Sequence, residues 1–103
     1  MTDWVDICSA DDVDEEDVIA AEYNGQSIAI YRSPEDEFYA TSGLCTHENV
    51  LLADGLVMGD IIECPKHNGQ FNYKTGEAKR LPACEHLITF AVKVIDGRVM
   101  IKV

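Results

Sequence analysis

Apolar and polar side chains alternate over short segments of this chain, and turns rich in glycine and proline separate those segments. Residues 18–23 and 27–32 flank Asn24-Gly25, a dipeptide that accepts a positive φ at both central positions of a type I′ turn. The sequence therefore predicts a β-hairpin here, and a single helical turn after Ser9. Further short strands are predicted at residues 4–7, 38–41, 61–64, 70–73, 89–95 and 98–103, the first of them at a sheet edge.

No segment keeps the 3.6-residue period of an amphipathic helix, so the predicted fold is all-β, a small antiparallel β-sandwich or barrel. The strand predicted at residues 89–95, with Val94 on its apolar face, is expected to pair with the last strand through Asp96-Gly97. Residues 43–84 are expected to form an irregular inserted half. A chain of 103 residues, 47% of them apolar, predicts a single domain over residues 1–103.

Acidic residues are concentrated in the first third of the chain. The whole sequence has 19 acidic and 8 basic residues and a formal net charge of −11, and residues 1–37 contain twelve of the acids and one base. This charge argues against nucleic acid or an anionic membrane as a partner and favours a basic one. The acidic run at residues 11–17 is interpreted as a solvated turn, with a docking patch as the alternative.

The start of the chain and its cysteine content suggest a reducing compartment. Residues 1–8 have neither a basic stretch nor an apolar signal segment, and no stretch of the chain approaches eighteen consecutive apolar residues. We therefore expect a cytoplasmic protein that does not cross a membrane. In that compartment the four cysteines are expected to be metal ligands or core residues, because thiols stay reduced there.

Two pairs of cysteine and histidine are the candidate metal ligands. Cys45 and His47 form a Cys-x-His pair, and Cys64 and His67 form a Cys-x-x-His pair, with residues 48–63 between them. Thiolate and imidazole both bind iron and zinc, and two loops that each present one of each can approach a metal from two sides. These four residues therefore predict a metal or iron–sulfur site.

The order of the ligands bears on the choice of metal. A tetrahedral zinc ion is satisfied by Cys2His2, but zinc modules usually group cysteine with cysteine and histidine with histidine. A [2Fe–2S] cluster with two thiolates on one iron and two imidazoles on the other uses the mixed order, so it is favoured and zinc remains the alternative. Cys84 and His86 form a third pair, interpreted as a partly buried thiol and a surface histidine, and Cys8 is expected to be a small core residue.

The two loops resemble those of the Rieske-type [2Fe–2S] ferredoxins of bacterial aromatic-ring-hydroxylating dioxygenases. The resemblance covers nearly the whole chain and rests on Cys-Thr-His at 45–47, Cys-Pro-Lys-His-Asn-Gly at 64–69, Phe71-Asn72, Thr75-Gly76 and Leu81-Pro82-Ala83. It implies the Rieske fold, with a cluster-binding subdomain of two loops inserted at about residues 43–84, and one [2Fe–2S] cluster. By this resemblance Cys45 and Cys64 would bind one iron, and His47 and His67 the outer iron.

The same resemblance implies a function in aromatic hydrocarbon catabolism. The protein would be a one-electron carrier from a flavin-containing NAD(P)H reductase to a terminal oxygenase, not a catalyst, and a monomer or weak oligomer. Neither cluster loop carries the extra cysteine or hydroxyl found in the respiratory branch, which implies a potential near the lower end of roughly −150 to +300 mV. Three alternatives remain: a zinc-stabilised interaction domain, the ferredoxin of a di-iron monooxygenase, and a nitrite-reductase small subunit, which would usually lack the ligands.

Overall fold

The computed structural model describes residues 4–46, 49–66, 68–81 and 85–103 of the chain. Within these residues the secondary structure consists of short strands and two 3₁₀ helices, so the predicted all-β class is confirmed. The strands are β1 (Trp4–Ser9), β2 (Asp17–Tyr23), β3 (Gln26–Arg32), β4 (Phe38–Ser42), β5 (Leu56–Met58), β6 (Ile61–Glu63), β7 (Gln70–Asn72), β8 (Ala78–Arg80), β9 (Thr89–Phe90), β10 (Val92–Ile95) and β11 (Arg98–Lys102). The 3₁₀ helices are η1 (Ala10–Asp12) and η2 (Leu52–Asp54), and neither is long or apolar enough to cross a membrane.

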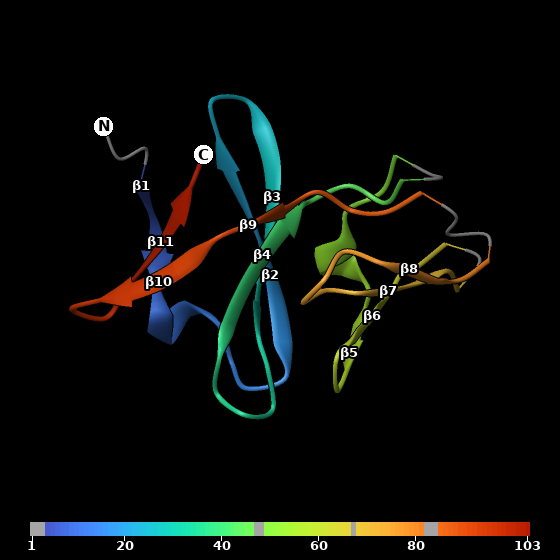
Figure 1. Cartoon of the computed structure of the whole chain (residues 1–103), viewed down its shortest axis with the longest axis horizontal. Helices are drawn as coiled ribbons and strands as arrows, with labels where there is room; N and C mark the ends of the chain where they lie inside the picture. The colour runs from blue at the N-terminus through green and yellow to red at the C-terminus, as the bar shows by residue number, and fades with distance from the viewer. Residues whose placement is uncertain (1–3, 47–48, 67, 82–84) are drawn as a thin grey trace.

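The described strands form three antiparallel sheets, with orders β1-β11-β10, β2-β3-β4-β9 and β5-β6-β7-β8. The first two sheets make up the part that we call the base, and the third, together with η2, forms a separate lobe beside it (Figure 1). All elements of the lobe lie between β4 and β9 in the sequence, as an insertion should. The expectation that this insertion is irregular was wrong, because its strands form a sheet of their own.

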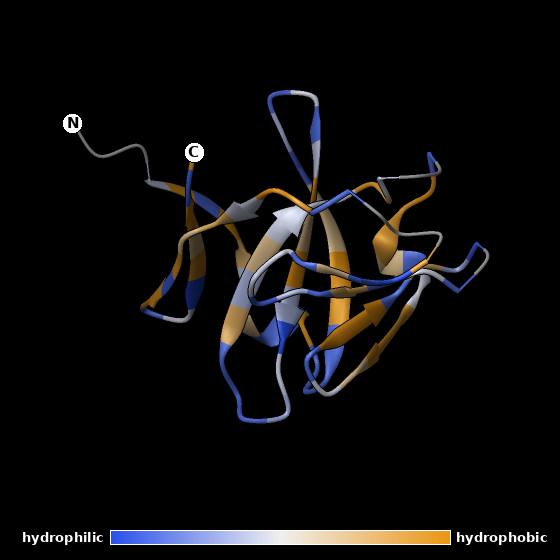
Figure 2. Cartoon of the chain, turned by 45° about the vertical axis from the view of Figure 1, so that its right-hand side comes forward, coloured by the Kyte–Doolittle hydropathy of each residue, from blue (hydrophilic) through white to orange (hydrophobic). Residues whose placement is uncertain are grey.

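The central strand β3 is buried on both of its faces. Ile28 and Ile30 pack into a hydrophobic core that the two sheets of the base share with Val99 and Ile101. Tyr31, on the opposite face of β3, packs into a second core between the base and the lobe. In Figure 2 hydrophobic residues lie mostly along the strands and hydrophilic ones in the hairpin turns. The lobe therefore packs on one face of β3 in the base.

The turns predicted from local sequence are confirmed. Asn24 and Gly25 have φ values of 52° and 77°, as a type I′ turn requires, and they join β2 to β3. The helical turn after Ser9 is η1, where Ser9 Oγ accepts a hydrogen bond from Asp11 N and Asp12 Oδ2 accepts one from Ser9 N. Strand β1 lies at the edge of its sheet, as predicted.

The segment 89–95 is two strands and not the single strand predicted. Strand β9 pairs with β4 in the second sheet, whereas β10 pairs with β11 in the first, so the chain changes sheets at Ala91. The carbonyl of Ala91 accepts a hydrogen bond from Lys102 N at 3.0 Å. The two halves have different neighbours, so the alternating apolar residues of this segment do not all face one core. Val94, predicted on the apolar face, is 43% exposed.

The turn between β5 and β6 is where the lobe contacts the base. Glu16 Oε2 of the base accepts a hydrogen bond from Gly59 N at 2.9 Å, and within the lobe the hydroxyl of Tyr73 donates to the carbonyl of Gly59. The ring of Tyr73 also stacks on Tyr31 of β3, with ring centroids 4.6 Å apart. These contacts fix the end of the lobe that carries the β5–β6 turn.

Candidate functional site

The first candidate loop follows β4, and Gly43 anchors the start of this loop. Gly43 N donates to Ser27 O at 2.9 Å, and Leu52 N donates to Gly43 O at 2.9 Å. A Cβ on Gly43 would lie 2.8 Å from Ile28 N, too close for any other residue without a shift of the backbone. The loop therefore starts in direct contact with the β2–β3 hairpin.

Within this loop, Leu44 and Leu51 form an isolated antiparallel bridge. Cys45 follows, with its backbone N donating to Val50 O at 3.0 Å, and its side chain is buried. His47 lies outside the described residues. Residues 44 and 45 are thus joined to residues 50 and 51, and the side chain of Cys45 is turned inward.

The second loop connects β6 to β7. Cys64 comes directly after β6 and is fully buried, and its backbone N donates to Gly69 O at 2.7 Å. Asn68 adopts a φ of 59°, which closes the turn. Gln70 Nε2 donates to Glu63 Oε1 at 2.8 Å and so joins the two strands at the ends of the loop. His67 lies outside the described residues.

Both cysteines belong to one buried hydrophobic cluster, together with Leu52, Ile62 and Phe71. Two sulfur donors in one apolar environment, each at the start of a tight loop, fit a metal or iron–sulfur group, because thiolates are soft ligands. Among the residues that the structure describes, no group of three or more His, Cys, Asp or Glu side chains is placed to hold a metal ion. The pairing of Cys45 and His47 with Cys64 and His67 at one site stays a prediction.

The other cysteine and histidine candidates have different environments. Cys8 is buried in the core of the base, where burial raises the pKa of its thiol, so the predicted core role is confirmed. His86 is exposed, as predicted, and its Nδ1 accepts a hydrogen bond from Ala78 N at 3.0 Å. Cys84 lies outside the described residues.

The segment around His86 borders the first loop. Thr46 Oγ1 donates to Glu85 O at 2.9 Å, and Leu87 N donates to Gly76 O at 2.8 Å. Leu81, which starts this segment, is 75% exposed. Together with exposed Leu44 and Leu51, it places apolar side chains beside the two loops.

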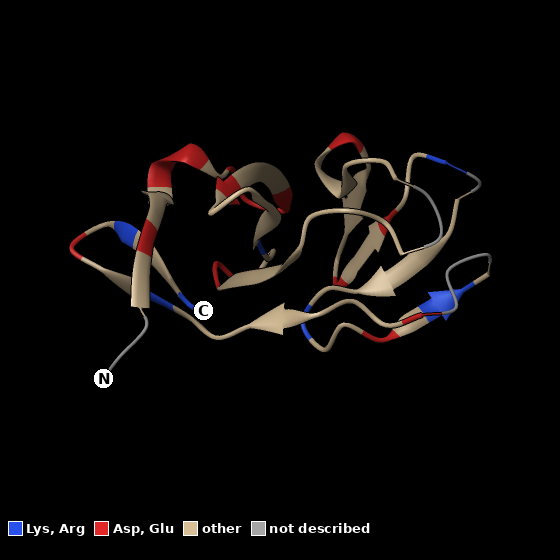
Figure 3. Ribbon diagram, turned by 90° about the horizontal axis from the view of Figure 1, so that it is seen from above, with Lys and Arg blue, Asp and Glu red and all other residues tan. Residues whose placement is uncertain are grey.

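Charge is distributed unequally between base and lobe. Figure 3 shows acidic residues on η1 and the neighbouring parts of the base, and basic residues towards the loop end of the lobe. Lys66 lies in the second loop, and Lys79 and Arg80 lie on β8.

The contacts of Glu16 and Tyr73 between lobe and base were not predicted from the sequence, since no local motif links residues that lie so far apart in the chain.

Comparison with known proteins finds a family model and relatives that match nearly the whole chain. The model of the Rieske [2Fe–2S] domain matches residues 3–91. The ferredoxin component of the naphthalene 1,2-dioxygenase/salicylate 5-hydroxylase systems of Ralstonia sp. is 42% identical over 99 residues, which cover 96% of this chain and 94% of that protein. The match to an iron–sulfur family favours the cluster over the zinc alternative.

Two solved structures are similar over nearly their whole length. The complex of reduced oxygenase and oxidized ferredoxin in carbazole 1,9a-dioxygenase contains a chain with a TM-score of 0.90 and 36% identity, covering 99% of this chain and 94% of that one. The Sphingomonas yanoikuyae B1 ferredoxin has a TM-score of 0.90 and 35% identity, covering 96% and 97%. These similarities agree with the expectation of an electron-transfer component and not a catalyst.

Proposed function

This chain belongs to the Rieske [2Fe–2S] family, and we propose that it is the ferredoxin of a multicomponent aromatic-ring dioxygenase. Its cofactor is one Rieske-type [2Fe–2S] cluster. In this role it passes single electrons from a flavin-containing NAD(P)H reductase to a terminal oxygenase. The observation that carries the proposal is the burial of Cys45 and Cys64 in the same hydrophobic core, each in one of the two loops. The fold around them is shared with a dioxygenase ferredoxin.

The proposed ligands are Cys45 and Cys64 on one iron and His47 and His67 on the other. The bound cluster supplies a centre that accepts and releases one electron. Burial of both cysteines excludes water from the sulfur side of the site. The hydrogen bonds from Cys45 N to Val50 O and from Cys64 N to Gly69 O hold the two loops in shape.

The terminal oxygenase is proposed to contact the protein around the two loops. Leu44, Leu51 and Leu81 are exposed there and offer apolar area for a transient contact. The carbazole dioxygenase complex supports this partner class, because a ferredoxin of the same fold is bound to an oxygenase in it. The cytoplasm is the proposed location, since it supplies NAD(P)H and keeps thiols reduced.

Reconstitution tests the proposal. The purified protein is combined with a flavoprotein reductase, NADH and the oxygenase component of a naphthalene dioxygenase system, and product formation is followed. We expect a coloured protein, an electron paramagnetic resonance signal that appears only on reduction, and turnover that depends on this chain. A colourless, zinc-containing protein from iron-replete cells would contradict the proposal. Electron delivery to a di-iron hydroxylase alone would assign it to a monooxygenase system.

A further inference from the structure

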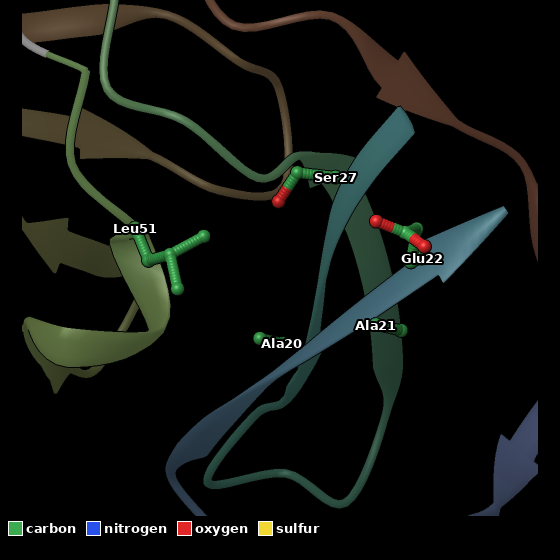
Figure 4. Close-up of a pocket in the computed structure, with 5 residues that line it drawn as sticks. All are labelled: Ala20, Ala21, Glu22, Ser27 and Leu51. Atoms are coloured by element: carbon green, nitrogen blue, oxygen red, sulfur yellow. The ribbon is translucent and has the colours of Figure 1, made fainter. Parts of the chain in front are cut away.

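A groove of about 410 Å³ lies between the β2–β3 hairpin and the first cluster loop (Figure 4). Its lining consists of Ala20, Ala21, Glu22, Ser27 and Leu51. Leu51 projects from one side and the hairpin residues form the other. The groove is therefore shared by the base and by the loop that carries Cys45.

The register of the hairpin determines which side chains face this groove. Glu22 of β2 is paired with Ser27 of β3, so their side chains lie on one face of the sheet, and Ala20 lies two residues away on that same face. Gly43 N donates to Ser27 O, which fixes the hairpin against the start of the first loop. The groove is thus a preformed feature built on hydrogen-bonded backbone.

Its chemistry combines apolar walls with one carboxylate. Ala20 and Leu51 present methyl groups, and Glu22 is the single charged residue of the lining. Within the described part of the chain, no side chain forms an ion pair or hydrogen bond with Glu22. The surrounding first third of the chain is also strongly acidic. This combination suits a lysine or arginine, whose aliphatic stem packs on apolar surface while its charged end meets a carboxylate.

We propose that this groove receives a lysine or arginine side chain of the terminal oxygenase. The inference rests on the proposed function, which places the oxygenase on Leu44, Leu51 and Leu81. Because Leu51 belongs both to that contact and to the groove, an oxygenase seated on the loops extends over the groove. Glu22 then adds charge complementarity at the border of the interface.

Two variants separate the apolar and the charged parts of the contact. Ala20→Trp fills the groove from an exposed position and should raise the KM of the oxygenase for this protein about tenfold at every salt concentration, with kcat unchanged. Glu22→Gln should raise that KM about threefold at low salt and leave it unchanged at high salt, because an exposed ion pair is weak and screened.

Matched controls come from the same chain. Glu15→Gln removes one charge from the acidic third outside the groove, and Ala91→Trp adds an indole to the base at an exposed position next to β9, on the edge of the sheet opposite β2. Ala91→Trp should keep the KM of the unmodified protein, and Glu15→Gln should raise it by less than about twofold at low salt, because it removes only long-range attraction. The cluster absorbance and the thermal midpoint of each variant show whether it folds. If Ala20→Trp does not fold, Glu22→Arg should raise the KM about tenfold at low salt by charge repulsion.

Unchanged KM values in the folded groove variants would overturn the inference while leaving the proposed function intact. A higher KM for the reductase, with the value for the oxygenase unchanged, would overturn the assignment of the groove to the oxygenase. An unmodified protein that delivers no electrons to the oxygenase would overturn the proposed function and the inference with it. Direct titration of the oxidised protein against the oxygenase should show the same order of affinities as the KM values.

Discussion

At the scale of single residues, Cys45 and Cys64 differ from the other cysteine seen in the structure by their place in the fold. Cys45, Cys64 and Cys8 are all buried, but Cys8 lies in the core of the base. Replacing Cys45 or Cys64 by Ala is expected to reduce cluster content to near zero, because a ligand is lost from a site that also ties two loops together. Visible absorbance and iron content measure the result.

The control for this prediction is Cys8→Ala, which removes an equally buried thiol and should keep the full spectrum. Cys84→Ala and His86→Ala should also keep it, since neither residue belongs to the proposed ligand set. A colourless Cys84→Ala protein would mean that the ligands had been assigned to the wrong loop.

Tyr73 makes stability depend on pH in the alkaline range. Burial, partly offset by the nearby Lys74 ammonium, raises the pKa of Tyr73 to about 12, and burial also raises the pKa of Tyr31. An unfolded chain ionises these phenols near pH 10. Between about pH 10 and 12 the unfolded state therefore loses protons first, so the stabilisation present below pH 10 is lost as pH rises.

Tyr73→Phe tests this dependence. The variant should lose about 1 kcal/mol of unfolding free energy near pH 8, because the hydrogen bond from the Tyr73 hydroxyl to Gly59 O is removed. Its stability should then fall less steeply above pH 10 than that of the unmodified protein. Urea unfolding at a series of pH values measures both effects, and parallel curves for the two proteins would contradict the assignment.

At the scale of elements, the turn between β5 and β6 is where the lobe is held on the base. Lys74 Nζ lies 3.0 Å from Asp60 Oδ1 and 3.1 Å from Glu35 Oε1, and it lies 5.3 Å from the centroid of the Tyr39 ring. Hydrogen bonds to Asp60 and then Glu35 raise the pKa of Lys74, so the ammonium stays charged. One side chain thus links the lobe to the β3–β4 turn.

Lys74→Met is expected to loosen this junction while preserving the cluster. The amide hydrogens of β5 and β6 should exchange roughly two- to fivefold faster, because opening of the lobe no longer separates an ion pair. Lys79→Met is the matched control, since Lys79 forms its ion pair with Glu77, which also lies in the lobe. Equal exchange rates in the two variants would show that Lys74 does not hold the junction.

The elements also show which parts of the fold could be predicted from sequence. Asn24-Gly25 specifies its hairpin through local backbone preferences, and the spacing of the two cysteine–histidine pairs indicates the site directly. Strands β5 (Leu-Val-Met) and β8 (Ala-Lys-Arg) were not predicted, because neither shows alternation of apolar and polar residues. Glu16 and Gly59 are 43 positions apart, so no local sequence pattern indicates their contact.

At the scale of the whole molecule, charge and contact surface are separated. The excess of acidic residues lies in the first 37 positions, on the base, whereas the proposed contact surface lies at the loops of the lobe and reaches the base only at the groove beside Glu22. At ordinary ionic strength a field extends about 10 Å, so the acidic base can speed the approach of a basic partner without forming the contact. Leu81, 75% exposed beside the loops, belongs to the proposed contact surface itself.

Combined replacement of Asp11, Asp14 and Glu15 by their amides tests this separation. These side chains are exposed, whereas Glu16 must be kept because it accepts the hydrogen bond from Gly59 N. We expect the second-order rate of electron delivery to fall about threefold at low salt and to recover at high salt, with the rate inside the docked complex unchanged.

Leu81→Ala should instead weaken docking at every salt concentration, because apolar contact is not screened. Stopped-flow reduction of the oxygenase over a salt series measures both variants, and the limiting rate at saturation reports on the docked complex. A triple variant that loses this limiting rate, beside a Leu81→Ala protein that behaves normally, would place the contact surface on the acidic base. The electron would then have to leave the protein far from the two loops, which the position of Cys45 and Cys64 in the lobe argues against.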